Sequence, residues 1–382
     1  MKNEEWKNVK LEDLCDELSD GLHKAPVFVE NGEYIFVNAK NLAKGYIVDP
    51  DKSKHTSYEE YLKYKIDLNE RTILYSIDGT IGNIARYRGE KCVLGKGACY
   101  INLKKDIFAD FIYYQLQSPH FNRYINHLTT GSTIGHISLK TMRNYTFSLP
   151  PLAEQQRIAK ILSALDDKIE LNNAINRKLE EQAKAIFNSV YDKAVNQVPF
   201  TSIISIASGG TPKTSESSFW NGNIPFFTPK DVGIPFTLNT EKYITDEGLN
   251  NCNSRLYPTN TTFITARGTV GKLSLAAKPM AMNQSCFALV SERINPILIY
   301  MYAIRAVDSL KKKSNGAVFD AITIKDFETE RVNKLSDEEI KPLSSVIEPI
   351  YSQIRLNTIE NHRLSDLRDS LLPKLMSGDL GV

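Results

Sequence analysis

The chain has 382 residues, of which 42% are apolar, 24% charged and 9% aromatic, as in an ordinary globular protein that buries its own core. Its 47 basic and 45 acidic side chains leave a net charge of only +2, so charge alone would not hold it on DNA. No run of 18 apolar residues is present and the first residues are polar, which predicts a cytoplasmic protein without a membrane span or signal peptide.

The cysteines and histidines do not follow the spacing of a metal site or a disulfide framework. The cysteines are odd in number and never spaced as Cys-x-x-Cys, so we expect reduced, mostly buried thiols at Cys15, Cys92, Cys99, Cys252 and Cys286. None of the six histidines belongs to a recognisable metal-ligand motif. The sequence therefore predicts no metal site.

Residues 1–150 are expected to form a first globular domain of mixed α/β structure, with a helix over 106–116. Three of its loops place small or polar residues beside cations, which suits close approach to a phosphate backbone. If DNA is the partner, the candidate contacts are Lys40, Asn41, Thr80, Arg86, Arg88, Ser132, Thr133 and His136. Ordinary hairpin turns and solvated lysines would look similar, so this alternative stays open.

Residues 151–192 carry the pattern of a long coiled-coil helix. Apolar positions alternate in steps of four and three along a seam at Ile158, Leu162, Leu165, Ile169, Asn172, Asn176, Leu179, Ala183, Ile186 and Val190. Two of these positions are asparagines. A polar residue on such a seam costs stability but fixes the register and the partner of the helix.

Residues 193–336 are expected to form a second domain, after a boundary between 192 and 199. Short strands are predicted over 261–264, 273–275 and 286–290. Loops like those of the first domain supply the candidate DNA contacts Lys230, Arg267, Thr269, Lys272, Lys312 and Asn315. Over both domains, Arg267, Lys230 and Lys40 are the preferred candidates.

Residues 337–382 repeat the helical pattern and end in a short tail. Their seam runs through Leu343, Ile347, Ile350, Ile354, Asn357, Asn361, Leu364, Arg368, Leu371 and Leu375. Arg368 is out of character on an apolar seam. Pro349 lies off the seam and is expected to kink this helix or delay its start.

The two halves of the chain are therefore copies of one another. Leu171-Asn172 recurs as Leu356-Asn357 at an offset of 185, and the turn over 78–82 recurs over 267–271 at an offset of 189. Cys99 falls near Cys286, and the segment that starts at His136 matches the one that starts at Ala321. An old duplication without a present role would leave the same trace. Repetition of the helices as well as the domains favours a target in two parts.

We expect the two helices to pack on each other within one chain, antiparallel, which would place Asn172 and Asn176 near Asn361 and Asn357. Pairing with a second copy of the chain is the alternative. Helices of about 35 to 40 residues span roughly 50 to 60 Å, which could hold two domains one to two turns of DNA apart, at ~34 Å per turn.

Three segments then carry a family resemblance. Residues 149–158, Leu-Pro-Pro-Leu-Ala-Glu-Gln-Gln-Arg-Ile, closely resemble the central conserved region of specificity subunits of type I restriction-modification systems. Gly-Gly-Thr-Pro at 209–212, followed by Phe-Trp-Asn-Gly-Asn-Ile-Pro at 219–225, looks like the opening of a target recognition domain in that family. Residues 371–380 look like the usual C-terminus. The first domain lacks the Gly-Gly-Thr-Pro opening and residues 336–341 lack the Pro-Pro and Gln-Gln features, so the two domains should read different half-sites.

The resemblance implies a non-catalytic subunit with two tandem target recognition domains, which read a split, asymmetric sequence in double-stranded DNA. Two methyltransferase subunits that use S-adenosylmethionine would dock on the helices, and two motor-nuclease subunits that use ATP and magnesium would join them. This chain would bind none of these cofactors. It has no Asn-Pro-Pro-Tyr or Asp-Pro-Pro-Tyr sequence, and the segment from Gly89 to Lys96 has the wrong spacing for a phosphate loop. A stand-alone DNA-binding regulator and a coiled-coil scaffold that ignores DNA remain the alternatives.

Overall fold

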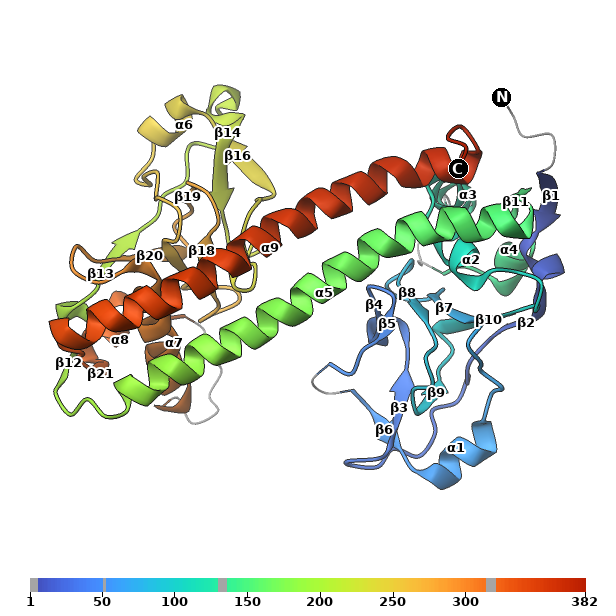
Figure 1. Cartoon of the computed structure of the whole chain (residues 1–382), viewed down its shortest axis with the longest axis horizontal. Coiled ribbons are helices and arrows are strands. Elements are labelled where there is room, and N and C mark those ends of the chain that lie inside the picture. The colour runs from blue at the N-terminus through green and yellow to red at the C-terminus, as the bar shows by residue number, and fades with distance from the viewer. Residues whose placement is uncertain (1–5, 51–52, 130–135, 314–320) are drawn as a thin grey trace. The chain divides into compact units, whose positions relative to one another are not determined.

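The computed structural model describes residues 6–50, 53–129, 136–313 and 321–382. The chain divides into two compact units. The first unit joins Met1–Asp167 to Leu364–Val382, and the second unit is Lys168–Arg363. Each unit contains one globular domain and one part of each of two long helices, α5 (Leu152–Tyr191) and α9 (Asp337–Ser377), labelled in Figure 1.

The globular domain of the first unit is built on a four-stranded antiparallel sheet in the order β2-β10-β7-β8. A three-stranded sheet, β6-β3-β9, and the pairs β1·β11 and β4·β5 accompany it. The strands are β1 (Lys7–Lys10), β2 (Cys15–Asp20), β3 (Tyr34–Val37), β4 (Leu42–Ala43), β5 (Tyr46–Ile47), β6 (His55–Thr56), β7 (Thr72–Ser76), β8 (Ile84–Arg86), β9 (Cys92–Leu94), β10 (Ala98–Leu103) and β11 (Thr146–Leu149). The helices are α1 (Tyr58–Tyr64), α2 (Ala109–Gln115), α3 (Pro119–Thr129) and α4 (Leu139–Arg143), with 3-10 turns at Leu11–Leu14 and Ala39–Asn41.

The domain of the second unit repeats this plan. Its main sheet has the order β13-β20-β17-β18-β15, beside a sheet β16-β14-β19 and the pair β12·β21. The strands are β12 (Gln197–Pro199), β13 (Ser205–Ser208), β14 (Trp220–Phe227), β15 (Phe236–Thr237), β16 (Lys242–Ile244), β17 (Thr262–Thr265), β18 (Leu273–Ala276), β19 (Ala281–Met282), β20 (Cys286–Val290) and β21 (Arg331–Asn333). The helices are α6 (Asp246–Asn250), α7 (Pro296–Lys313) and α8 (Ile324–Thr329), with 3-10 turns at Phe200–Ser202 and Ser217–Phe219.

The shared strand order confirms the mixed α/β fold and the duplication. Strands β17, β18 and β20 lie where the sequence predicts them, and α2 falls within 106–116. Cys99 lies one residue from the position equivalent to Cys286, close to it as predicted. Ala98 pairs with Ser76 in the first domain, and Cys286 pairs with the corresponding Thr265 in the second.

Helices α5 and α9 pack side by side in opposite directions (Figure 1). In the second unit, the Asn172 side-chain amide donates to Asn361 Oδ1 at 2.8 Å, and the Asn357 amide donates to Asn176 Oδ1 at 2.7 Å. Partner numbers rise along one helix while they fall along the other, which confirms the antiparallel packing. Asn172 is 1% exposed and Asn357 6%, so these pairs form a polar layer inside the helix contact.

Arg368 has a partner that the linear pattern of its own helix cannot reveal. In the first unit its guanidinium donates to Asp166 Oδ1 of α5 at 2.6 Å. The other oxygen of Asp166 accepts a hydrogen bond from the Tyr114 hydroxyl of α2 at 2.7 Å. The arginine on the seam therefore links α9 through α5 to the globular domain.

The expected delay of the second helix at Pro349 is wrong, because α9 already begins at Asp337. A capping box starts it. The Ser336 hydroxyl accepts the Glu339 amide at 3.3 Å, and the Glu339 carboxylate accepts the Ser336 amide at 2.8 Å. These hydrogen bonds hold the pKa of Glu339 below its ordinary value. The residues that replace the Pro-Pro feature therefore supply their own helix start.

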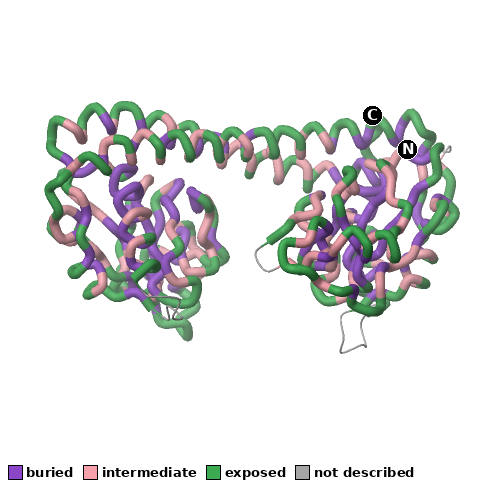
Figure 2. Tube along the Cα trace, turned by 90° about the horizontal axis from the view of Figure 1, so that it is seen from below, coloured by how far each residue is buried: buried purple, intermediate pink, exposed green. Residues whose placement is uncertain are grey.

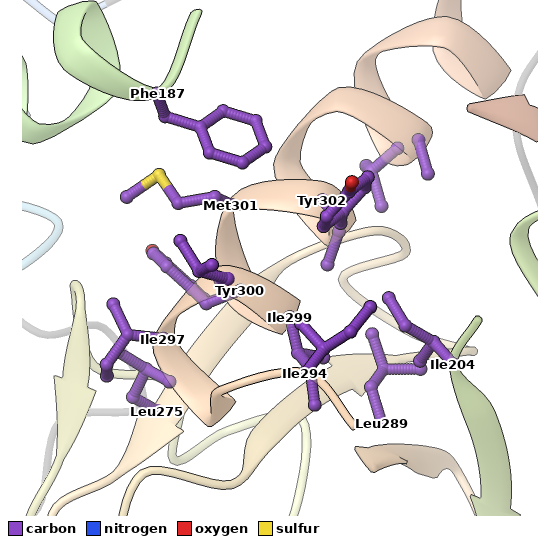
Figure 3. Packing of buried hydrophobic residues seen from close by; sticks show 14 of the residues in the cluster. Phe187, Ile204, Leu275, Leu289, Ile294, Ile297, Ile299, Tyr300, Met301 and Tyr302 are labelled. Atoms are coloured by element: carbon purple, nitrogen blue, oxygen red, sulfur yellow. The ribbon is translucent and has the colours of Figure 1, made fainter. Parts of the chain in front are cut away.

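Each unit has its own apolar core, which Figure 2 shows in the interior of each globular domain. The core of the first unit takes Leu162 from α5 and Leu375 from α9, together with residues of the sheet and α2. In the second unit, Phe187 of α5 packs edge-on against Tyr302 of α7, with ring centroids 5.4 Å apart (Figure 3). None of the helices that the structure describes is long and apolar enough to cross a membrane.

Adjacent residues of α9 offer a test of the helix packing. Ile347 is 0% exposed in the core of the second unit, and Val346 is 49% exposed. We expect Ile347→Ala to lower the free energy of unfolding by about 2–5 kcal/mol, because it leaves a cavity. Val346→Ala should change it by less than about 0.5 kcal/mol. Urea unfolding of the full chain measures both, and equal losses would contradict this packing.

Candidate nucleic-acid interface

A glycine turn joins β7 to β8 in the first domain and β17 to β18 in the second, with the same internal hydrogen bonds. The Ser76 hydroxyl donates to the Thr80 carbonyl at 2.6 Å, and the Thr265 hydroxyl donates to the Thr269 carbonyl. The first glycine of each turn has a positive φ, 72° at Gly79 and 81° at Gly268. A side chain would strain the backbone there, so the turn favours glycine.

A second loop, with a lysine at the same place, is tied to each turn. The Asn83 side-chain amide donates to the Ala39 carbonyl at 2.8 Å, and the Thr269 hydroxyl donates to the Pro229 carbonyl at 3.3 Å. The next residues are Lys40 and Lys230, and both are exposed. The side chain of Lys230 is 80% exposed and lies 3.8 Å from Glu241, a weak surface ion pair.

A third segment closes the arrangement in each domain. Ile137 donates its amide to the Ile77 carbonyl at 2.8 Å, and Ile322 donates its amide to the Ala266 carbonyl at 2.9 Å. Three loops thus meet in each domain: 38–41, 78–82 and 136–138 in the first, and 228–231, 267–271 and 321–323 in the second. We call each set a loop cluster.

Several candidates lie in or beside the loop cluster of the second domain with exposed side chains. Arg267 and Thr269 belong to the turn, and Lys230 belongs to the neighbouring loop. Lys272 directly follows the turn, and Lys312 lies in the last turn of α7. In the first domain, Lys40, Thr80 and His136 hold comparable positions and are exposed.

Two candidates of the first domain have structural roles instead. Asn41 is fully buried, and its side-chain amide donates to the Val48 carbonyl and the Ser53 hydroxyl. Arg86 is 20% exposed and forms an ion pair with Asp110 of α2 at 2.5 Å. Neither side chain is available to a partner at the surface, so we remove both from the candidate interface.

Arg88 lies beyond β8, away from the loop cluster. Its guanidinium donates to the Gly45 carbonyl at 2.7 Å and lies 4.1 Å from the centre of the Tyr46 ring. These contacts hold the side chain against β5. Ser132, Thr133 and Asn315 fall outside the described residues.

Sequence reasoning missed a fourth loop that supports each cluster. The Ile77 amide donates to the Gly97 carbonyl at 3.1 Å, and the Ala266 amide donates to the Ser285 carbonyl at 2.8 Å. The preceding residue of the first loop is Lys96, which is exposed. In the sequence, Lys96 stands out only as the end of a segment with the wrong spacing for a phosphate loop. Its position just before a predicted buried strand, which pairs with the strand leading into the turn, is the signal available in the sequence.

The exposed groups of the two loop clusters are suited to binding a ligand. Backbone amides, hydroxyls and cations at exposed positions can contact phosphates and base edges. In the described part of the chain, no group of three histidine, cysteine or acidic side chains could hold a metal ion. All five cysteines are free, and Cys92, Cys99 and Cys286 are buried. Burial raises the pKa of Cys92 and of Cys286 to about 12, which keeps both thiols protonated.

Comparison with known proteins identifies the class to which this fold belongs. A family model described as "Type I restriction modification DNA specificity domain" matches residues 3–181 and 193–364, one match over each globular domain and part of its helix. The chain belongs to this family and is a non-catalytic specificity subunit of a type I restriction-modification system.

Individual relatives can be aligned with this chain over most of their own length. The chain is 23% identical over 338 residues to the type I restriction enzyme MjaIX specificity subunit of Methanocaldococcus jannaschii, covering 81% of this chain and 78% of that protein. It is 20% identical over 358 residues to the HindI specificity subunit of Haemophilus influenzae, covering 72% and 78%. A crystal structure of a type I restriction-modification S subunit from M. genitalium shares the fold, with a TM-score of 0.60, 18% identity and coverage of 98% and 97%.

Substitutions of two threonines in β17 would test whether side-chain hydrogen bonds hold the glycine turn of the second domain. Thr262 and Thr265 are both fully buried, but only the Thr265 hydroxyl has a hydrogen-bond partner among the described residues. We expect Thr265→Val to lower the free energy of unfolding by about 1–3 kcal/mol, since it leaves buried backbone groups of the turn unpaired. Thr262→Val removes a hydroxyl without a partner, so it should be neutral or stabilising. Urea unfolding would refute this account if the two variants lost stability equally.

Proposed function

We propose that the chain reads a bipartite, asymmetric sequence in double-stranded DNA, one half-site with each loop cluster. The observation that carries this proposal is the pair of loop clusters, which share one backbone frame but differ in side chains. A shared frame suits the phosphate backbone, which is the same at both half-sites. Different side chains suit different bases.

The charges of the chain fit this role. Its net charge is only +2, yet Lys230, Arg267 and Lys272 are exposed in or beside one loop cluster. A locally basic patch on a nearly neutral protein provides few phosphate contacts. Partner subunits would therefore supply much of the affinity for DNA, while this chain supplies the selectivity.

The helices set the spacing between the half-sites in this proposal. Helix α5 has 40 residues and α9 has 41, so each is about 60 Å long at ~1.5 Å per residue. The asparagine pairs, Asn172 with Asn361 and Asn357 with Asn176, would keep one register and thus one spacer length.

Exposed leucines on the helices support docking of two methyltransferase subunits. Leu171 of α5 is 54% exposed and Leu356 of α9 is 53% exposed, and the two hold the same position in the repeat. An exposed apolar side chain that a protein partner would bury suits such a contact. Two equivalent positions suit two copies of one partner. S-adenosylmethionine would bind to those subunits, and ATP and magnesium to motor-nuclease subunits if they join.

The proposal is tested by mapping adenine methylation in cells that express the cognate methyltransferase subunit, with and without this chain. We expect a split motif with a fixed spacer only when the chain is present. The mapping also distinguishes the alternatives. A folded methyltransferase without any chain-dependent methylation would favour a stand-alone DNA-binding regulator or a scaffold.

The docking surface makes a quantitative prediction. Leu171→Glu should remove one methyltransferase subunit from the reconstituted complex, and Leu171→Glu with Leu356→Glu should remove both, because each places a charge in an apolar contact. Native mass spectrometry measures the stoichiometry. Val195→Glu is the matched control, since Val195 is 94% exposed between α5 and β12. Two bound subunits in the double variant would rule out these leucines as the contact.

A further inference from the structure

The first residue of the glycine turn is aspartate in one domain and arginine in the other. Asp78 precedes Gly79, and Arg267 precedes Gly268. Both residues sit at the same place in the fold, because Asp78 forms an isolated antiparallel bridge with His136, and Arg267 forms one with Ala321. The side chains at this shared position carry opposite charges.

The backbone at this position is held from both sides. In the first domain, the Ile77 amide donates to the Gly97 carbonyl and the Ile77 carbonyl accepts the Ile137 amide. Ala266 makes the equivalent bonds with Ser285 and Ile322. The backbone that carries the side chain at this position is already ordered, so only the side chain loses conformational entropy when it binds a ligand.

Loops 38–41 and 228–231, unlike the glycine turns, do not reverse the charge of their side chain between the two domains. Lys40 and Lys230 carry the same charge at the same place in both clusters. A residue that contacts phosphate has no reason to differ between two half-sites, whereas a residue that reads bases must differ if the half-sites differ. The position of Asp78 and Arg267, where the charge is reversed, is therefore one at which the two domains would discriminate sequence.

The side chain of Arg267 is suited to guanine. It is exposed and makes no hydrogen bond or ion pair with any residue that the structure describes. Its planar guanidinium presents paired donors, and guanine presents two adjacent acceptors, N7 and O6, in the major groove. No other base pair offers that arrangement on one base edge.

Asp78 is suited to cytosine. Its Oδ1 accepts the Gly79 amide at 2.9 Å, which orients the carboxylate at the start of the turn. A carboxylate is repelled by phosphates and can only accept hydrogen bonds. In the major groove its possible donors are N4 of cytosine and N6 of adenine, and the neighbouring N7 acceptor of adenine would repel it.

Resting on the proposed DNA-reading function, we propose that Arg267 reads a guanine in one half-site and that Asp78 reads a cytosine in the other. Lys230 and Lys40 contact the phosphates beside them. The proposal assigns one base position in each half-site to one named side chain.

The test is the methylation motif of the complete methyltransferase complex with Arg267→Ala or Asp78→Ala. Arg267→Ala should relax the preference for guanine at one position of one half-site by roughly 5- to 150-fold, with the other half-site and the spacer unchanged. Asp78→Ala should do the same for cytosine in the other half-site. Arg267→Lys keeps the charge but lacks the paired donors, so it should relax the same position.

Lys230→Ala is the comparison for a phosphate contact. It should lower methylation at all sites evenly, without a change in base preference. The proposal is overturned if Arg267→Ala behaves like Lys230→Ala, or if both Ala variants at the turn keep the wild-type motif. Wild-type chain without any methylation would instead reject the proposed function. If Arg267→Ala shows no cooperative unfolding in urea, the motif of Arg267→Lys decides.

Discussion

The packing of α5 against α9 is the constraint on which the rest of this structure depends. Each helix contributes to the core of both units, as Leu162 and Phe187 of α5 show. A slip of one helix turn along the seam would therefore pull residues out of two cores at once. It would also separate Asn172 from Asn361 inside the contact, which leaves buried amides without partners. Apolar burial holds the helices together, and the amide layer selects one alignment.

On this scaffold the two domains have kept their backbone and changed their surface. The hydroxyls of Ser76 and Thr265 form the same hydrogen bond inside equivalent turns. The carbonyls of Ala39 and Pro229 each accept a side-chain hydrogen bond, although the donors, Asn83 and Thr269, hold different positions in the repeat. The residues that hold these turns are buried or hydrogen-bonded, so substitutions of them lower the stability of the fold. Exposed positions of the clusters carry no such cost. Duplication thus yields two readers that share one fold and can acquire separate preferences.

The sequence predicted the helices and their pairing well, because a heptad seam and its polar interruptions depend only on residues of the helices themselves. Contacts across the fold were harder to predict. Arg86 resembles a surface cation in the sequence, but its partner Asp110 lies in a different element. Asn41 resembles a polar loop residue, but the chain folds back so that Val48 and Ser53 bury it. The exact residue equivalent to Cys286 is Ala98, the neighbour of Cys99, and only the strand pairing identifies it.

The first unit is made from two stretches that are far apart in the sequence, so it cannot complete its core until the second stretch has been synthesised. Leu375 and Met376 complete the core that contains Ile158 and Leu162, yet the ribosome makes them near the end of synthesis. At about 5–20 residues per second, the stretch between Asp167 and Leu364 takes roughly 10 to 40 s to synthesise. During that interval the first domain exposes the apolar surface that α9 later covers. A chain truncated before Leu364 would keep that surface exposed, and chaperones and proteases would recognise it as unfinished.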